Sequence, residues 1–171
     1  IVVNTLNMEN LRISVITVCS EFNTPIDLHN CIRMLDVDDQ IKYIENGEET
    51  KGVSQKKIRK QRNPQKKKVF YNQTTIHYMH SKVVNIKLFN NGKIQMTGLK
   101  YEDQGKEILS ELIQKIESVD DKNEQKIFLK QDVKYDFSNY RVVMINSDFD
   151  IGMKINRENL HQELISTNMY S

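Results

Sequence analysis

The sequence predicts an α+β fold in which an antiparallel sheet carries helices along one face. Three strand-like segments follow one another between residues 74 and 98, and a long amphipathic helix comes directly after them. A third observation is an internal similarity at a spacing of 127 residues, which indicates duplication of one structural unit. The chain is therefore expected to hold two related copies of a strand and helix unit.

Composition places few limits on function. The chain has 171 residues, of which 38% are hydrophobic and 28% charged, and no stretch approaches the roughly 20 apolar residues that span a bilayer. Its first residues do not resemble a secretory leader. Cys19 and Cys31 make no disulfide framework in a chain of this size, so we expect free thiols and an intracellular, reducing setting.

Basic residues are concentrated in one segment. The net charge is +2, but residues 56–68 hold 8 of the 25 basic residues and no acidic one, so the rest of the chain carries 17 minus 23, or −6. Such a segment attracts phosphate backbones by releasing condensed counterions. The alternatives are a solvated basic loop or a nuclear localisation signal. The predicted phosphate contacts are Lys56, Lys57, Arg59, Lys60, Arg62, Lys66, Lys67 and Lys68.

The N-terminal part reads as a strand followed by a helix. Residues 11–20 are rich in β-branched side chains, and Pro25 marks the turn that follows. Asp27 is the predicted N-cap of a short helix. The apolar stripe of that helix is Leu28, Cys31, Ile32 and Leu35. Residues 36–68 are polar and contain two glycines, so we interpret them as an insertion or long loop.

A hairpin is predicted between residues 83 and 98. The strands 83–89 and 93–98 flank Asn90-Asn91-Gly92, and a strand at 74–81 precedes them. With Gly92 in the left-handed conformation, one face of the hairpin carries Ile86, Leu88, Ile94 and Met96 and forms the core. The opposite face carries Asn85, Lys87, Phe89, Gln95 and Thr97. Phe89 is the exception on that polar face; it either packs under a neighbouring loop or contacts a ligand.

The longest predicted helix covers residues 102–119. Its apolar stripe is Ile108, Leu109, Leu112, Ile113, Ile116 and Val119, which should lie across the core face of the sheet. Residues 120–138 form a charged connector, with a short strand or helix of its own at 127–129.

The internal similarity sets the predicted domain limits. A shift of 127 residues places Val15-Ile16 on Val142-Val143 and residues 20–23 on 147–150. The second copy shows a strand at 140–147 and a helix at 156–166, so we expect a truncated repeat with an unpaired sheet edge. The predicted units are 1–119, which includes the insertion, a connector at 120–139, and a partial second copy at 140–171.

These features resemble the TATA-box-binding protein family. The segment from Lys87 to Gln104, KLFNNGKIQMTGLKYEDQ, is similar to the family's stirrup hairpin and the start of its long helix: an apolar-Phe pair, two small polar residues, Gly-Lys, Thr-Gly and acidic-acidic-Gln follow in that order. Ile26-Asp27-Leu28 and residues 140–155 fit the two repeats, whereas 36–68 and the connector do not. Residues 70–73 and 145–152 look more like viral members, so the resemblance implies a divergent member from a large DNA virus.

The resemblance implies a helix-grip saddle, with a curved sheet whose concave face lies in a widened minor groove and with helices on the convex face. Proteins of this kind push apolar side chains between base steps and bend the duplex. Phe89 aligns with one of the family's inserting phenylalanines. The second wedge should be Phe70 or Tyr71, between which the spacing does not decide.

The resemblance also implies a set of groove-facing residues. On the hairpin these are Lys87, Gln95 and Thr97, and on the two repeated strands they are Val15, Thr17, Cys19, Val142, Met144 and Asn146. The family normally has Asn at the positions of Val15 and Val142, which puts donor-based recognition of A·T pairs in doubt. Lys87 and Gln95 replace residues that are usually apolar and favour phosphate or acceptor contacts.

The expected function is that of a non-enzymatic transcription initiation factor. The four histidines form no metal-ligand pattern, and no phosphate loop or nucleophile motif is present, so we expect no catalysis, metal or cofactor. The implied partners are double-stranded promoter DNA, general initiation factors and the RNA polymerase machinery, in the nucleus or a viral replication compartment. The alternative is a non-catalytic module of the same fold that recognises nucleic acid or protein without TATA specificity.

Overall fold

The computed structural model describes residues 11–54, 70–150 and 152–167. The chain divides into two compact units, Ile13–Asn146 and a smaller one formed by Ile1–Arg12 with Ser147–Ser171. The elements follow in the order β1 (Arg12–Phe22), α1 (Leu28–Met34), β2 (Ile41–Asn46), β3 (Glu49–Gly52), β4 (Gln73–Met79), β5 (Val83–Phe89), β6 (Lys93–Leu99), α2 (Asp103–Asp120), β7 (Phe137–Asp148) and α3 (Arg157–Ser166).

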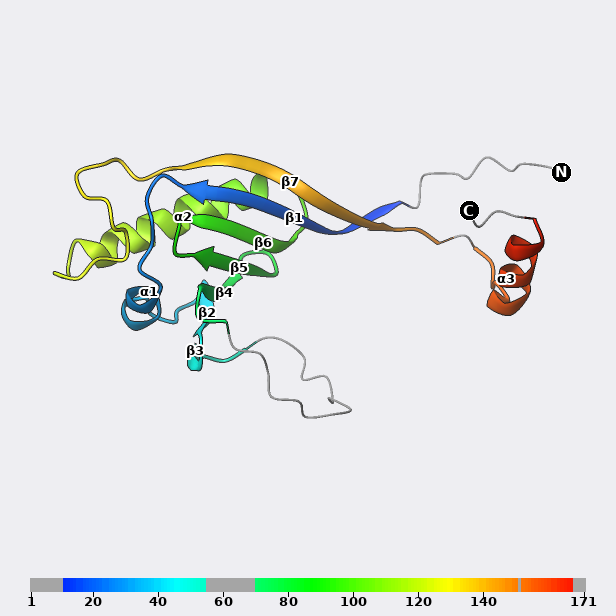
Figure 1. The fold of residues 1–171 in the computed structure, drawn as a ribbon, viewed down its shortest axis with the longest axis horizontal. Helices are drawn as coiled ribbons and strands as arrows, with labels where there is room; N and C mark the ends of the chain where they lie inside the picture. Colours follow the sequence, from blue (N-terminus) through cyan, green and yellow to red (C-terminus); the bar gives the residue numbers. More distant parts are fainter. Residues whose placement is uncertain (1–10, 55–69, 151, 168–171) are drawn as a thin grey trace. The chain divides into compact units, whose positions relative to one another are not determined.

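The strands form a 7-stranded sheet in the order β3-β2-β4-β5-β6-β1-β7 (Figure 1). The pairs from β3 to β1 are antiparallel. Beside β1, the Ser14 hydroxyl donates to the carbonyl of Asn146 and the Ser20 hydroxyl to that of Ser138, so β7 also runs opposite to its neighbour. The sheet and its helices confirm the predicted α+β class.

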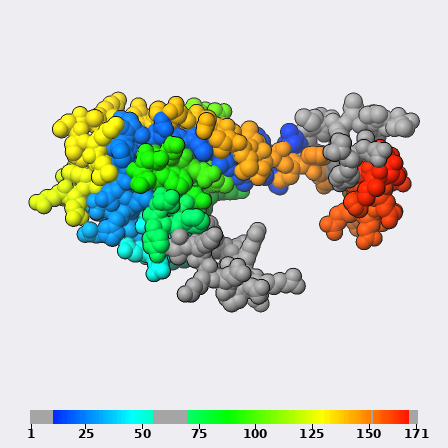
Figure 2. Space-filling model, viewed as in Figure 1, coloured from blue at the N-terminus to red at the C-terminus, as the bar shows by residue number. Residues whose placement is uncertain are grey.

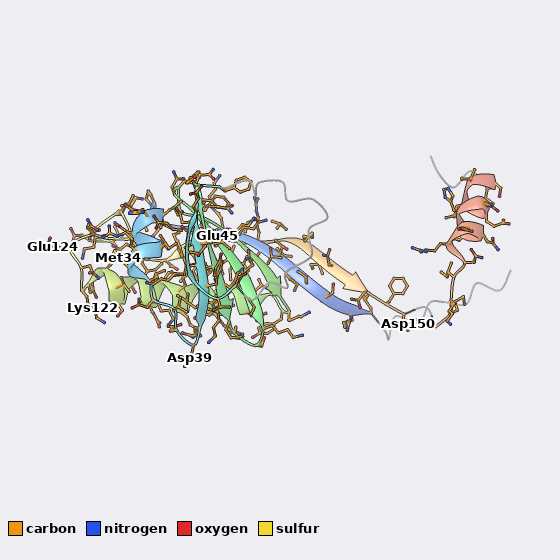
Figure 3. The ribbon with its side chains drawn as sticks, turned by 90° about the horizontal axis from the view of Figure 1, so that it is seen from below. Met34, Asp39, Glu45, Lys122, Glu124 and Asp150 are labelled. Carbon is orange, nitrogen blue, oxygen red and sulfur yellow. The ribbon has the colours of Figure 1, made fainter. Side chains whose placement is uncertain are left out.

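Two strands occur where the sequence predicted an insertion or long loop. β2 and β3 form a hairpin that extends the sheet beyond β4, with Ile41 and Ile44 buried in the core. Figure 3 shows β2 between Asp39, just before the strand, and Glu45 near its other end. The prediction of a loop was wrong here because most residues of 36–52 are polar or exposed, so their composition hides a short edge hairpin.

One face of the sheet, the core face, packs against α2. The helix residues Ile108, Leu109, Leu112 and Ile116 are fully buried against the strand residues Ile86, Leu88 and Met96, also fully buried. In the view of Figure 1, α2 lies behind the sheet. Gly92 has a φ of 84° in the β5–β6 turn, as predicted, and Leu88 pairs with Ile94. The opposite side of the sheet is called the open face below.

Helix α1 and the connector close the remaining core. The Asp27 carboxylate accepts a hydrogen bond from the Asn30 amide at 2.9 Å, which confirms the predicted N-cap. In the connector, Ile127 and Phe128 are fully buried, and Phe128 forms an isolated β-bridge with Ile26. The short element expected at 127–129 is therefore this bridge.

The smaller unit contains α3. Its N-cap Asn156 accepts hydrogen bonds from the amides of Glu158 and Asn159 at 3.1 and 3.2 Å. The helix agrees with the prediction for 156–166, and none of its residues is buried. None of the described helices has the length and apolar character needed to cross a membrane.

Candidate nucleic-acid interface on the open face

Strand pairing brings together the predicted groove residues of β1, β5 and β6. Lys87 pairs with Gln95, Gln95 with Cys19, and Thr97 with Thr17. Paired residues lie on the same side of a sheet, and residues two apart along a strand share that side. The open face therefore carries the predicted residues Val15, Thr17, Cys19, Lys87, Phe89, Gln95 and Thr97. In Figure 2 this side is in view, with β1 in blue and β5–β6 in green.

Phe89 points away from the core. It is the last residue of β5, where buried and half-buried residues alternate, and its neighbour Leu88 is fully buried on the core face. Phe89 itself is half-buried and lines a hollow of about 860 Å³ on the open face, together with Cys19, Gln95 and Arg141. The ring is thus not enclosed by Ile86, Leu88, Ile94 and α2.

Exposure on the open face is uneven. Val15, Cys19, Lys87, Gln95 and Thr97 are half-buried. Thr17 is only 3% exposed, with its hydroxyl oxygen 3.5 Å from that of Thr97. On β4, Thr75 and His77 are buried, and the Tyr43 ring lies 5.0 Å from the imidazole of His77. A ligand would therefore meet the open face mainly over β5, β6 and β1.

Three described cations of the open face form no ion pair. Within the part of the chain that the structure describes, the side chains of Lys87, Lys93 and Arg141 form no ion pair and no hydrogen bond. Several cations elsewhere are paired, such as Lys106 with Asp103 at 2.8 Å and Lys51 with Asp36 at 3.0 Å. An uncompensated cation remains available to an anionic ligand.

The two candidates for a second wedge are both exposed. Phe70 is 58% and Tyr71 67% accessible. The Tyr71 ring packs on Gly47 in the β2–β3 turn: a Cβ at Gly47 would lie 2.7 Å from two of the ring carbons. Gly47 has a φ of 60°, a conformation that favours glycine. The turn thus supports Tyr71 on one side, which the sequence did not indicate.

The second repeated strand presents a different face from the one predicted. Val142 packs against the hydrophobic core, and the Tyr140 hydroxyl donates to the carbonyl of Glu102 at the start of α2. By alternation Met144 and Asn146 share this side, so Val142, Met144 and Asn146 are turned away from the open face. The repeat comparison does not determine the register between β1 and β7, and a shift of one residue exchanges the faces. Asn139, with a φ of 52°, marks an irregularity just before this stretch.

The predicted phosphate contacts belong to the basic segment 56–68. All eight, from Lys56 to Lys68, lie outside the described residues. Across the described ranges no group of three or more His, Cys, Asp or Glu side chains could hold a metal ion, and Cys19 and Cys31 are free thiols.

Comparison with known proteins finds a similar viral protein. No protein-family model matches the chain. Over 166 residues, however, 91% of the chain, it is 29% identical to a protein described as TATA-box-binding protein-like from Acanthamoeba polyphaga mimivirus. The chain is therefore similar to a TATA-box-binding-protein-like protein, in line with the resemblance seen in the sequence. That relative is a viral protein, and residues 70–73 and 145–152 of this chain look more like viral members of the family.

The chain spans 45% of the length of that relative. Among solved structures, TBP from Methanococcus jannaschii matches with a TM-score of 0.46 and 12% sequence identity, over 88% of this chain and 65% of the archaeal one.

Proposed function

We propose that the chain binds duplex DNA through its open face and bends promoter DNA by inserting Phe89 into the minor groove. The observation that carries this proposal is the orientation of Phe89. The ring is half-buried at the end of β5, on the side of the sheet opposite to the fully buried Leu88. A large aromatic side chain on a polar sheet face, beside a hollow, suits a wedge between base pairs.

The neighbours of Phe89 fit the energetics of such a wedge. Separating one base step costs a few kcal/mol, which contacts along the bent duplex must recover. Gln95, Thr97 and Cys19 offer polar groups along the sheet, and the unpaired Lys87 offers a positive charge. The basic run at 56–68 would add phosphate contacts. Val15, on the open face in place of the family's Asn, supplies no donor, so we expect weak discrimination among A·T-rich sites.

The biological setting follows from the same proposal. The relative is described as TATA-box-binding protein-like, and a role in transcription initiation fits both that description and the open face. The partners would then be promoter DNA, general initiation factors and the RNA polymerase machinery, inside a cell, in the nucleus or a viral replication compartment.

The proposal is tested by replacing Phe89. Phe89→Ala should lower the affinity for duplex DNA by about 1–3 kcal/mol, the contribution of one stacked aromatic, and should reduce the bend angle. Affinity is measured by fluorescence anisotropy, and bending by energy transfer between dyes at the two duplex ends. Tyr101→Ala is the matched control, because Tyr101 is an exposed aromatic just before α2 whose hydroxyl donates a hydrogen bond to Glu107.

Unchanged bending and affinity in Phe89→Ala would show that Phe89 is not a wedge. The same assay on Phe70→Ala and Tyr71→Ala identifies the second wedge, which we expect to be Tyr71 because Gly47 supports its ring. If the wild-type chain binds duplex DNA without bending it and without a steep salt dependence, the alternative of a protein-interaction module applies.

A further inference from the structure

Arg141 lies on the open face beside the predicted groove residues. The side-chain amide of Asn139 donates a hydrogen bond to the Glu21 carboxylate, which sets Asn139 of β7 next to Glu21 of β1. Two residues further on, Arg141 shares this side with Cys19, and both line the hollow that Phe89 also lines. Arg141 is therefore close to the proposed wedge, although it comes from a distant part of the sequence.

Its two neighbours in sequence determine this orientation. The Tyr140 hydroxyl donates a hydrogen bond to the carbonyl of Glu102, and Val142 packs against the core. Side chains alternate along a strand, so the residue between them must point to the opposite side. The same register that turns Val142 away from the open face turns Arg141 toward it.

The hollow offers the groups that bind phosphate. Arg141 and Lys93 are exposed, and among the described residues their side chains have no partner. Asn72, Asn90 and Asn91 also line the hollow, and their side-chain amides can donate hydrogen bonds. Glu21 is the one carboxylate among the described residues that line the hollow, and with Lys93 and Arg141 these residues carry a net charge of +1. Arginine donates two parallel hydrogen bonds to phosphate oxygens, and such contacts position a protein on the duplex.

We propose that this hollow binds one backbone phosphate of the DNA, held by Arg141 with help from Lys93. The inference rests on the proposed function and adds a contact to it: a phosphate held here would fix the strand next to the base step that Phe89 opens. The Glu21 carboxylate would repel the bound phosphate. The hydrogen bond that Asn139 donates to this carboxylate keeps Glu21 beside the hollow.

The salt dependence of binding tests the phosphate site. Arg141→Gln should reduce the slope of log K against log salt by about 0.9, the value for one phosphate contact on B-DNA. Its loss of affinity should be equal on two duplexes of unrelated sequence, because phosphates carry no sequence information. Arg141→Lys should retain the slope, since it retains the charge. Glu21→Gln should have the opposite effect to Arg141→Gln and bind more tightly than the wild type.

Arg33→Gln is the matched control. Arg33 is an exposed arginine on α1 that bonds to Gln125, away from the hollow, and its removal should leave the slope at the wild-type value. Thermal unfolding checks that each variant folds. A slope for Arg141→Gln equal to that of Arg33→Gln, or a loss confined to one DNA sequence, would overturn the phosphate site.

The two proposals fail in different ways. If the wild-type chain neither binds nor bends duplex DNA, the proposed function fails whatever Arg141 does. If the wild type bends DNA, Phe89→Ala abolishes the bend, and Arg141→Gln keeps the full slope, only the phosphate site is refuted.

Discussion

At the scale of single residues, Cys31 has a strongly altered ionisation. Its side chain is fully buried in α1, and this burial raises the pKa of the thiol from 9.0 to about 12, with smaller contributions from Asp120 and Asp27. A thiol that cannot ionise near neutral pH is neither nucleophilic nor a metal ligand. Cys31 therefore serves as a small apolar residue in the core, in the helical stripe where the sequence placed it.

The raised pKa of Cys31 predicts loss of stability at alkaline pH. In the unfolded chain the thiol ionises near pH 9, whereas in the folded protein it stays neutral until about 12. The contribution of the neutral thiol to the free energy of unfolding is therefore complete below pH 9. It is lost as the pH rises from 9 to 12, at about 1.4 kcal/mol per pH unit. Urea unfolding at pH 8 and pH 10.5 should show a decrease on the order of 2 kcal/mol from this group.

The control for this prediction is Cys31→Ala. The variant should be less stable than the wild type at pH 8, because it leaves a small cavity, but its stability should fall less between the two pH values. Tyr78 and Tyr140 also have raised pKa values, through burial, and they add the same alkaline loss to both proteins. An equal decrease in both proteins would contradict the assignment to Cys31.

At the scale of elements, the connector after α2 is part of the core despite its charged composition. The buried carboxylate of Asp120 accepts hydrogen bonds from the amides of Ile127 and Phe128 at 2.7 and 3.0 Å. The Phe128 ring then packs edge-on against Phe22, with a centroid distance of 5.3 Å. Asp120 thus acts as a cap that returns the chain to the sheet.

Asp120→Ala should destabilise the fold. The substitution leaves two buried N–H groups without an acceptor, at about 1–3 kcal/mol each, so we expect a loss of roughly 2–6 kcal/mol in the free energy of unfolding. Urea denaturation followed by circular dichroism measures it. Asp121→Ala, at the exposed neighbouring position, should stay within about 0.5 kcal/mol of the wild type. Comparable stabilities for the two variants would show that the cap is unimportant.

At the scale of the larger unit, contact between β7 and α2 determines which side chains reach the open face. The Tyr140 ring passes directly over Gly105, where no Cβ interferes, and its hydroxyl bonds to Glu102. The Lys106 ammonium lies 5.6 Å from the ring centroid. This contact joins β7, the second repeated strand, to α2, and it orients Arg141.

Gly105→Ala should weaken the attachment of β7. Replacing glycine by alanine within a helix normally stabilises it by about 0.5–1 kcal/mol, but here the methyl group would collide with the Tyr140 side chain. Hydrogen exchange should show a loss of amide protection of tenfold or more in residues 140–146, with β4–β6 unchanged. Ser110→Ala, at an exposed position of the same helix, is the control. Increased or unaltered protection of 140–146 would mean that Tyr140 does not anchor the strand.

Local sequence patterns predicted the central part of the fold and one half of the candidate interface. The turn Asn90-Asn91-Gly92 and the alternation from Ile86 to Met96 are sufficient to place Phe89, Lys87 and Gln95 on the open face. The predicted N-cap Asp27 lies where α1 begins, and the helix predicted at 156–166 is α3. The β2–β3 hairpin was missed, since both strands are short, β3 is polar, and the apolar residues of β2 (Ile41, Tyr43 and Ile44) do not alternate regularly with polar ones.

The sequence alone determines which residues of one helix or strand share a face, because the periods of 2.0 and 3.6 residues are local properties of the backbone. The sequence does not determine which side chains of β7 lie on the open face. That choice depends on the register between β1 and β7, which are more than a hundred residues apart, and on the fit of Tyr140 over Gly105. A one-residue shift in register exchanges Val142 for Arg141, so only the tertiary structure decides between an apolar and a cationic contact at that point.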